Sequence, residues 1–284
     1  MFENTIYEFR KELENLGYCK NVIDNYPKYI TIFLEYTKQI PPEVSTSDIK
    51  IYHDHLQEKQ HKTKDKKLSQ SHVHSQMLAI RIYFEYLERI QKIIKNPFTL
   101  KLKSPISEVK IILTQEEIDK LYARCKTAQE WAIMHLCYGC GLRRSEAQNL
   151  DVADVHLDKK LLFVRKGKGK KRRVIPITAI IANDFETYLQ IREKLLFNQQ
   201  ETSFLIDNRG NRMQGNTIYK TFKDLLKRTK TKYNQEISLH HLRHSIATHL
   251  LENEMGIEMV RNFLGHQSLN TTQIYTRVNQ LKMK

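Results

Sequence analysis

The chain of 284 residues has little cysteine and no long apolar run. Its four cysteines are too few for a secreted disulfide framework, so we expect them to be reduced thiols. No apolar stretch approaches the roughly 18 residues that a membrane span needs, and the first residues lack the apolar core of a signal peptide. These absences argue against secreted and membrane proteins, and they predict a cytoplasmic protein without a membrane partner.

Acidic residues are also scarce relative to basic ones. Lys and Arg outnumber Asp and Glu by 47 to 32, which gives a formal net charge of +15. Such an excess attracts polyanions, of which nucleic acid is the commonest, although a basic surface without any partner gives the same number. The length is sufficient for two domains with buried cores, and 40% hydrophobic residues support a folded chain.

Glycine and proline are rare in the first part of the chain, where apolar residues recur at helical spacing. The pattern is interrupted at Gly17, at Pro41 and Pro42, and in the polar segment 61–67. It therefore predicts a helical domain over residues 1–95 that can close a small bundle. The four expected helices cover residues 2–16, 21–38, 46–59 and 69–93.

The helical pattern breaks near Pro97, where a stretch of mixed charge predicts an interdomain linker over residues 96–112. Thr114 and Glu117 then show the Thr-x-x-Glu spacing of a capping box, which predicts the start of a new helix. We therefore expect a second domain over residues 113–284.

The second domain carries one β signal among helical periods. The short apolar runs LLFV at 161–164 and RVIPI at 173–177 are joined across a basic turn, and they predict a hairpin. The expected fold class is mainly α with a small β element: a helical domain followed by a mixed α/β domain.

The segment CYGCGLRRSEAQNL begins at Cys137 and allows two interpretations, a thiol pair or a glycine-led turn that presents an arginine. A zinc site needs about four ligands, and the chain has no second Cys-x-x-Cys motif. A redox pair usually starts a helix after a strand, whereas a helical period precedes this one. We therefore expect Cys137 and Cys140 to pack on a helix, Arg143 to be the functional group, and Glu146 to support the helix start and orient its basic neighbours.

A helix is predicted after Ser238, with a buried leucine face. His240 and Arg243 lie three residues apart on another face, where they either bind an anion or form an ordinary solvated face. Further along, Gly265 is expected to end a helix in the left-handed conformation and so to fix the position of His266.

Basic residues fill the predicted hairpin turn, in which Gly167 and Gly169 permit a tight bend. Such a turn either follows a phosphate backbone or is a solvated surface element. The basic residues of this hairpin are Arg165, Lys166, Lys168, Lys170, Lys171, Arg172 and Arg173.

The order of these motifs resembles that of the tyrosine recombinase, or phage integrase, family, and especially of its compact Xer-like members. Each motif alone is a weak signal, but several separated motifs in the family's order are a specific one. The motifs are GLRRSE at 141–146, GKG at 167–169, HHLRH at 240–244, LGH at 264–266 and Tyr275.

The resemblance covers the whole chain. Residues 1–95 resemble the family's core-binding (SAM-like) DNA-binding domain, and residues 113–284 resemble its catalytic domain. Of two adjacent histidines, His240 rather than His241 keeps the family's spacing to the second arginine. The catalytic residues that the resemblance implies are Arg143, Lys168, His240, Arg243, His266 and the nucleophile Tyr275. The residues expected to contact DNA are Arg165, Lys166, Lys170, Lys171, Arg172 and Arg173.

The implied activity is site-specific recombination of double-stranded DNA through a 3′-phosphotyrosine intermediate, with no metal ion, cofactor or ATP. The resemblance also implies four protomers on two sites, a location at the cytoplasmic nucleoid, and room for a second recombinase or an accessory protein. The outcome would be integration, excision, inversion or dimer resolution.

Two alternatives share part of this pattern. A type IB topoisomerase uses similar cleavage chemistry, but the compact size and the motif spacing favour recombination. A DNA-binding regulator that keeps the fold without catalysis would have lost one or more of Arg143, Arg243 and Tyr275, and this chain retains all three.

Overall fold

The computed structural model describes residues 3–60, 67–104, 111–165, 172–197, 200–229 and 237–265. The chain divides into two compact units, Met1–Glu108 and Val109–Lys284. The division falls inside the stretch that the sequence marks as a linker. Each unit has its own buried apolar core, and the two are described separately below.

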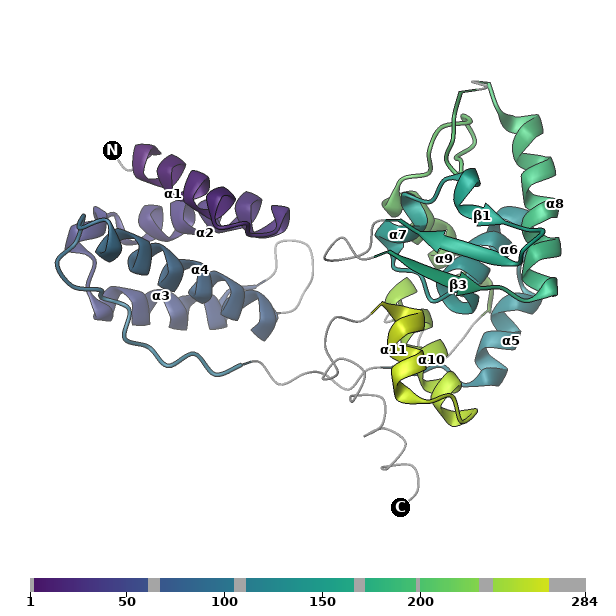
Figure 1. Cartoon of the computed structure of the whole chain (residues 1–284). Helices are drawn as coiled ribbons and strands as arrows, with labels where there is room; N and C mark the ends of the chain where they lie inside the picture. The colour runs from purple at the N-terminus through teal and green to yellow at the C-terminus, as the bar shows by residue number, and fades with distance from the viewer. Residues whose placement is uncertain are drawn as a thin grey trace, which may run out of the picture. The chain divides into compact units, whose positions relative to one another are not determined.

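The first unit consists of helices (Figure 1), and all four predicted helices are confirmed. The last of them ends about one turn earlier than expected. A short 3₁₀ turn at Pro41–Glu43 stands where the two prolines interrupt the pattern. The helices are α1 (Glu3–Asn15), α2 (Lys20–Thr37), α3 (Thr46–Glu58) and α4 (Gln70–Arg89).

Aromatic rings fill the centre of the helical unit. Phe9 of α1 meets Tyr83 of α4 edge-on, with 5.2 Å between the ring centroids. Phe33 of α2 meets Tyr52 of α3 in the same way at 5.1 Å. Edge-to-face pairs of buried rings add to the free energy gained from burying their area. Phe33 also meets Phe84 of α4 edge-on at 6.2 Å, so the core joins all four helices into one bundle.

The second unit is helical around a small sheet, which confirms the expected fold class (Figure 1). The predicted capping box is present, because the Thr114 hydroxyl accepts from the Glu117 N–H and the Glu117 carboxylate accepts from the Thr114 N–H. The α-helices are α5 (Gln115–Ala123), α6 (Ala128–Met134), α7 (Arg144–Gln148), α8 (Ala179–Leu195), α9 (Gly215–Thr229), α10 (Leu239–Glu252) and α11 (Ile257–Leu264).

The sheet has three antiparallel strands in the order β1-β2-β3. The two predicted strands are confirmed as β2 (Leu161–Val164) and β3 (Arg173–Pro176). The sequence missed β1 (Val155–His156), because two residues are too short to show an alternating pattern. β2 and β3 are the described strands on either side of the basic turn.

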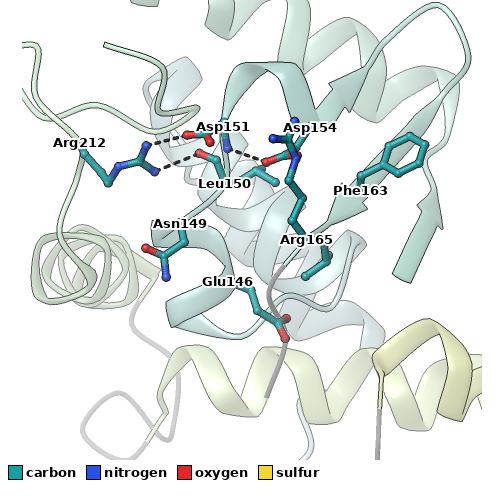
Figure 2. A pocket seen from close by; sticks show the side chains of 9 residues that line it. Glu146, Asn149, Leu150, Asp151, Asp154, Phe163, Arg165 and Arg212 are labelled. Carbon is teal, nitrogen blue, oxygen red and sulfur yellow. Dashed lines mark hydrogen bonds and ion pairs between the residues drawn. The ribbon is translucent and has the colours of Figure 1, made fainter. Parts of the chain in front are cut away.

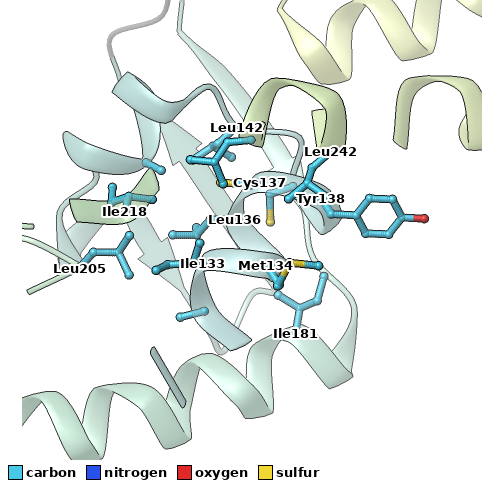
Figure 3. Close-up of a cluster of buried hydrophobic side chains, with 14 of the residues drawn as sticks. Ile133, Met134, Leu136, Cys137, Tyr138, Leu142, Ile181, Leu205, Ile218 and Leu242 are labelled. Carbon is cyan, nitrogen blue, oxygen red and sulfur yellow. The ribbon is translucent and has the colours of Figure 1, made fainter. Parts of the chain in front are cut away.

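Helix α6 runs into a π-helical turn, His135–Gly139, which passes through the core of the second unit. Figure 3 shows Ile133 and Leu136 among Leu142, Ile218 and the other labelled apolar side chains, with the Tyr138 ring pointing away from them. Since the π turn is surrounded by packed side chains, the residues that follow it begin from a fixed position.

Cys137 and Cys140 are fully buried in this core. Burial raises the pKa of each thiol to about 12, so neither forms a thiolate near neutral pH. The expectation that they are packing residues is confirmed. Within the described ranges, no helix is both long and apolar enough to cross a membrane.

Thiol labelling of the native protein tests this burial. Cys19 is exposed, whereas Cys125 is partly buried with a pKa raised by burial to about 12. We expect one fast-reacting thiol per chain with a disulfide reagent at mildly alkaline pH, and four after denaturation. The variant Cys19→Ser should lose the fast phase. Fast modification of Cys137 or Cys140, located by peptide mass mapping, would contradict the packing.

Candidate active site

Arg143 is placed by the turn that follows the π-helical segment. The Leu142 N–H donates to the Leu136 carbonyl at 2.9 Å, which closes the turn onto the core. Arg143 is the N-cap residue of α7, and its side chain is 22% exposed. The sequence prediction of a turn that presents this arginine is therefore confirmed.

Gly141 makes this turn possible for two reasons. Its φ of +58° lies in the left-handed region, which favours glycine. A Cβ atom at this position would also lie 2.9 Å from the Leu264 side chain at the end of α11. The left-handed backbone is the stronger constraint, and a side chain at residue 141 would in addition push the Leu264 side chain away from the turn that carries Arg143.

Glu146 lies in the first turn of α7 and holds arginines from three separate parts of the chain. Its carboxylate is 2.7 Å from Arg143 Nη1, 2.8 Å from Arg173 Nη2 and 3.7 Å from Arg243 Nη1. It also accepts the Arg143 N–H at 2.9 Å, which caps the helix. The expectation that Glu146 supports the helix start and orients basic neighbours is confirmed.

The carboxylate of Glu146 is almost fully buried, with 2% of its side chain exposed. Burial alone would raise the pKa of Glu146, but hydrogen bonds and charge from Arg173, the Arg143 N–H and the charge of Arg243 lower it to about 2. Glu146 is therefore ionised throughout the physiological range, and it partly neutralises the arginines around it.

Arg243 is buried in the same cluster, on α10. Its two Nη atoms donate to the carbonyl oxygens of Gly141 and Leu264. The side chain thus links the Arg143 turn to the last residue of α11. The guanidinium can do this because it presents several donors in a fixed plane and is always charged.

His240 and Arg243 project from neighbouring positions at the start of α10, which begins at the predicted N-cap Ser238. His241 is engaged with the helix start, because its Nδ1 accepts from the Ser238 N–H at 2.9 Å. His240 is exposed, and its ring lies 4.4 Å from the ring of His244. His240 is thus the more exposed of the two adjacent histidines.

Several predicted site residues lie outside the described residues. Among the catalytic candidates these are Lys168, His266 and Tyr275, and among the DNA-contacting candidates they are Lys166, Lys170 and Lys171. Gly265, directly before His266, ends α11 in the left-handed conformation with φ +64°, as predicted. The described part of the chain contains no group of three or more His, Cys, Asp or Glu side chains suited to a metal ion.

The described residues of the basic hairpin have three different environments. Arg172 is exposed. Arg165 is more than half exposed and pairs with the buried carboxylate of Asp154, as Figure 2 shows beside a pocket of about 370 Å³. Arg173 is only 8% exposed and pairs with Glu146. The sequence analysis placed Arg173 among the residues that contact DNA and so expected an exposed side chain. The structure instead places this side chain on the core-facing side of β3.

The sequence did contain a signal that Arg173 would face the core. Side chains alternate between the two faces of a strand, so Arg173 shares a face with Ile175, which is fully buried. The ion pair between Arg212 and Asp151, at 2.6 Å across the pocket in Figure 2, had no such signal. It joins residues 61 positions apart that only the fold brings together.

Glu146→Gln tests the electrostatic role of the buried carboxylate. The pKa of Glu146 in the folded protein, about 2, lies below the ordinary glutamate value of 4.5. The ionised carboxylate therefore contributes its full stabilisation above about pH 4.5, and this contribution is lost as the pH falls toward 2. We expect the variant to lose about 3 kcal/mol of unfolding free energy at neutral pH. In denaturant titrations the difference from wild type should shrink between these pH values.

The exposed Glu186 on α8 provides the matched control, since Glu186→Gln makes the same chemical change away from the arginines. It should shift the unfolding free energy by less than about 0.5 kcal/mol. A Glu146→Gln variant as stable as this control would show that the arginine cluster does not depend on the carboxylate.

Comparisons with known proteins point to one family. Residues 112–282 match the model of the Phage integrase family. The chain is 37% identical to tyrosine recombinase XerA of Pyrococcus horikoshii, over 70% of this chain and 67% of the relative. It is 31% identical to tyrosine recombinase XerD of Oceanobacillus iheyensis, over 100% of this chain and 97% of the relative.

Solved structures share the fold. The Tn1549 transposon integrase in complex with transposon right end DNA aligns with a TM-score of 0.75 and 18% identity, over 95% of this chain and 94% of that one. The XerH site-specific recombinase bound to its palindromic difH substrate aligns with a TM-score of 0.72 and 20% identity, over 98% and 82%. The chain therefore belongs to the phage integrase family, as a Xer-like tyrosine recombinase, an enzyme of site-specific DNA recombination.

Proposed function

We propose that this recombinase cleaves and rejoins double-stranded DNA at the Arg143–Arg243 cluster, through a phosphotyrosine intermediate on Tyr275. One observation carries the proposal: two arginines 100 positions apart, both matching the family's motifs, meet at one buried carboxylate. Glu146 holds them in place but does not neutralise them completely, because one carboxylate faces three guanidinium groups.

The arginines suit the charge that develops during cleavage. When an oxygen nucleophile attacks a phosphodiester, the nonbridging oxygens gain negative charge in a phosphorane-like transition state. Fixed guanidinium groups stabilise that charge and can bind two oxygens at once. Arg143, which is partly exposed beside the buried Arg243, would make the first contact with the scissile phosphate.

The remaining roles follow the family resemblance. The Tyr275 hydroxyl attacks phosphorus and loses its proton, for which His240 is the relay, since a free tyrosine has a pKa of about 10. The bond to the 5′ oxygen breaks, and Lys168 protonates that oxygen as it leaves. His266 would donate to a phosphate oxygen. The phosphotyrosine keeps the bond energy, so rejoining needs neither ATP nor a metal ion.

Phosphate contacts would come from both units. We propose that residues 1–95 form the core-binding DNA-binding domain, that 96–112 are the linker, and that 113–284 form the catalytic domain. Within the hairpin, Arg165, Arg172 and the three lysines around Lys168 would follow the DNA backbone. The relatives' DNA complexes support a DNA target.

Strand exchange would require four protomers on two sites, with or without a second recombinase or an accessory protein. The enzyme would act on the chromosome in the cytoplasm, at the nucleoid. Integration, excision, inversion and dimer resolution all use the same chemistry.

Trapping the covalent intermediate tests the mechanism. On suicide duplexes that carry the recombination site, wild type should form an SDS-resistant protein–DNA adduct with a free 5′ hydroxyl. Tyr275→Phe should form none, because phenylalanine has no nucleophilic oxygen. The matched control Tyr219→Phe removes a hydroxyl from α9 and should form the adduct normally. An adduct that survives Tyr275→Phe would refute this nucleophile.

Counting the products separates recombination from relaxation. Two differently labelled duplexes that carry the site should exchange strands and yield recombinant products. A type IB topoisomerase would relax supercoiled plasmid without any exchange, and a catalytically silent regulator would bind DNA without an adduct. Relaxation in the absence of recombinant products on a verified site would contradict the proposal.

A further inference from the structure

Arg173 connects three parts of the site through one side chain. Its Nη1 and Nη2 donate to the two oxygens of Glu146, at 3.1 and 2.8 Å. Its Nε donates to the Phe263 carbonyl at 2.9 Å, in the last turn of α11. Every nitrogen of the guanidinium therefore has a protein partner, and the side chain is 8% exposed.

The position of Arg173 in the chain gives these contacts their significance. It begins β3, the described strand after the basic turn that contains Lys168. Glu146, its partner, also holds Arg143. Phe263 stands two residues before Gly265, which precedes His266. One side chain thus joins the Arg143–Glu146 pair to the described residues that follow Lys168 and precede His266 in the chain.

The contact with α11 is close. A Cβ atom on Gly265 would lie 3.1 Å from both Cδ and Nη1 of Arg173, so the guanidinium packs directly against this glycine. The left-handed φ of Gly265 and the absence of its side chain both serve this approach. The corner at Gly265 is therefore shaped around Arg173.

The neighbouring arginines of the hairpin lack this arrangement. Arg172 is exposed, and Arg165 pairs with Asp154 while more than half of its side chain remains exposed. Both side chains are therefore accessible to a phosphate of the DNA backbone. Glu146 binds both Nη atoms of Arg173 but lies 3.7 Å from Arg243, so at Arg173 a phosphate would have to compete with the carboxylate for these two atoms. Displacing Glu146 would leave its carboxylate buried without its bidentate partner.

We propose that Arg173 is a positioning residue of the cleavage reaction, which fixes the hairpin strand, the Glu146–Arg143 pair and the Gly265 corner relative to one another, and that it does not bind DNA. This inference rests on the proposed function for its effect on cleavage. Lysine cannot replace this arginine, because a compact ammonium cannot bind both oxygens of Glu146 and also reach the Phe263 carbonyl.

Arg173→Lys and Arg173→Ala are compared with wild type in two assays on site-containing duplexes. In single-turnover cleavage at saturating DNA, we expect each variant to lose about 100-fold in rate, since displaced catalytic groups cost about that much. In equilibrium binding, the slope of log affinity against log salt should match that of wild type. Thermal unfolding of Arg173→Lys, run alongside, fixes an assay temperature at which the variant is folded.

Arg172→Ala is the matched control, because it removes the same charge one residue away. Since the exposed Arg172 is proposed to contact a DNA phosphate, the slope of log affinity against log salt should be smaller by about one for Arg172→Ala than for wild type. A merely structural role for Arg173 would lower the unfolding temperature and leave the cleavage rate of the folded, DNA-saturated protein unchanged. That result would overturn the inference, as would a salt slope for Arg173→Ala that falls like that of Arg172→Ala.

Failure of the proposed function would look different, because wild type itself would then form no adduct. The binding assay would still show whether Arg173 contacts DNA phosphate or only holds protein segments in position, since binding does not require cleavage. A double-mutant cycle of Arg173→Lys with Glu146→Gln, measured by unfolding, adds a second readout. If the changes in unfolding free energy of the two substitutions are clearly non-additive, they support the coupling of Arg173 to Glu146 on which the inference depends. Additive changes overturn the inference.

Discussion

A buried carboxylate organises this site. Removing an ionised carboxylate from water is costly unless cations and hydrogen bonds replace the lost hydration, and Glu146 obtains that replacement from guanidinium groups on α10 and β3 and at the start of its own helix. The dependence is mutual, because the buried Arg243 and Arg173 would repel each other without the carboxylate. The site is therefore assembled around one negative charge, although its expected substrate is an anion.

The backbone around this charge is arranged so that the arginines can reach it. The left-handed glycines at 141 and 265 allow the Arg143 turn and the end of α11 to approach the cluster, and Arg243 donates to the carbonyls of Gly141 and Leu264. The buried π-helical turn fixes the other side of the Arg143 turn. Charge, backbone conformation and core packing thus converge on the same few residues, which limits the movement of the groups that would contact phosphate.

Much of the fold could be predicted because its signals are local. Helix periods, the capping box at Thr114 and Glu117, and the left-handed stop at Gly265 each depend on a few consecutive residues. Strand β1 was missed because two residues carry no period, and the π turn was missed because it uses the same apolar spacing as the helix before it. Arg173 was assigned to the wrong environment because its charge was weighed more heavily than its place in the alternation of β3.

The sequence by itself determined the order of the elements, the identity of the motifs and the residue types that could carry the chemistry, since each depends on neighbours along the chain. The tertiary structure alone decided which of the basic residues are partnered and which are exposed. Arg172 and Arg173 are adjacent and chemically identical, yet one faces solvent and the other is held by Glu146. The physical reason is that burial and ion pairing depend on contacts between residues far apart in sequence, here 27 positions for Arg173 and Glu146 and 90 for Arg173 and Phe263.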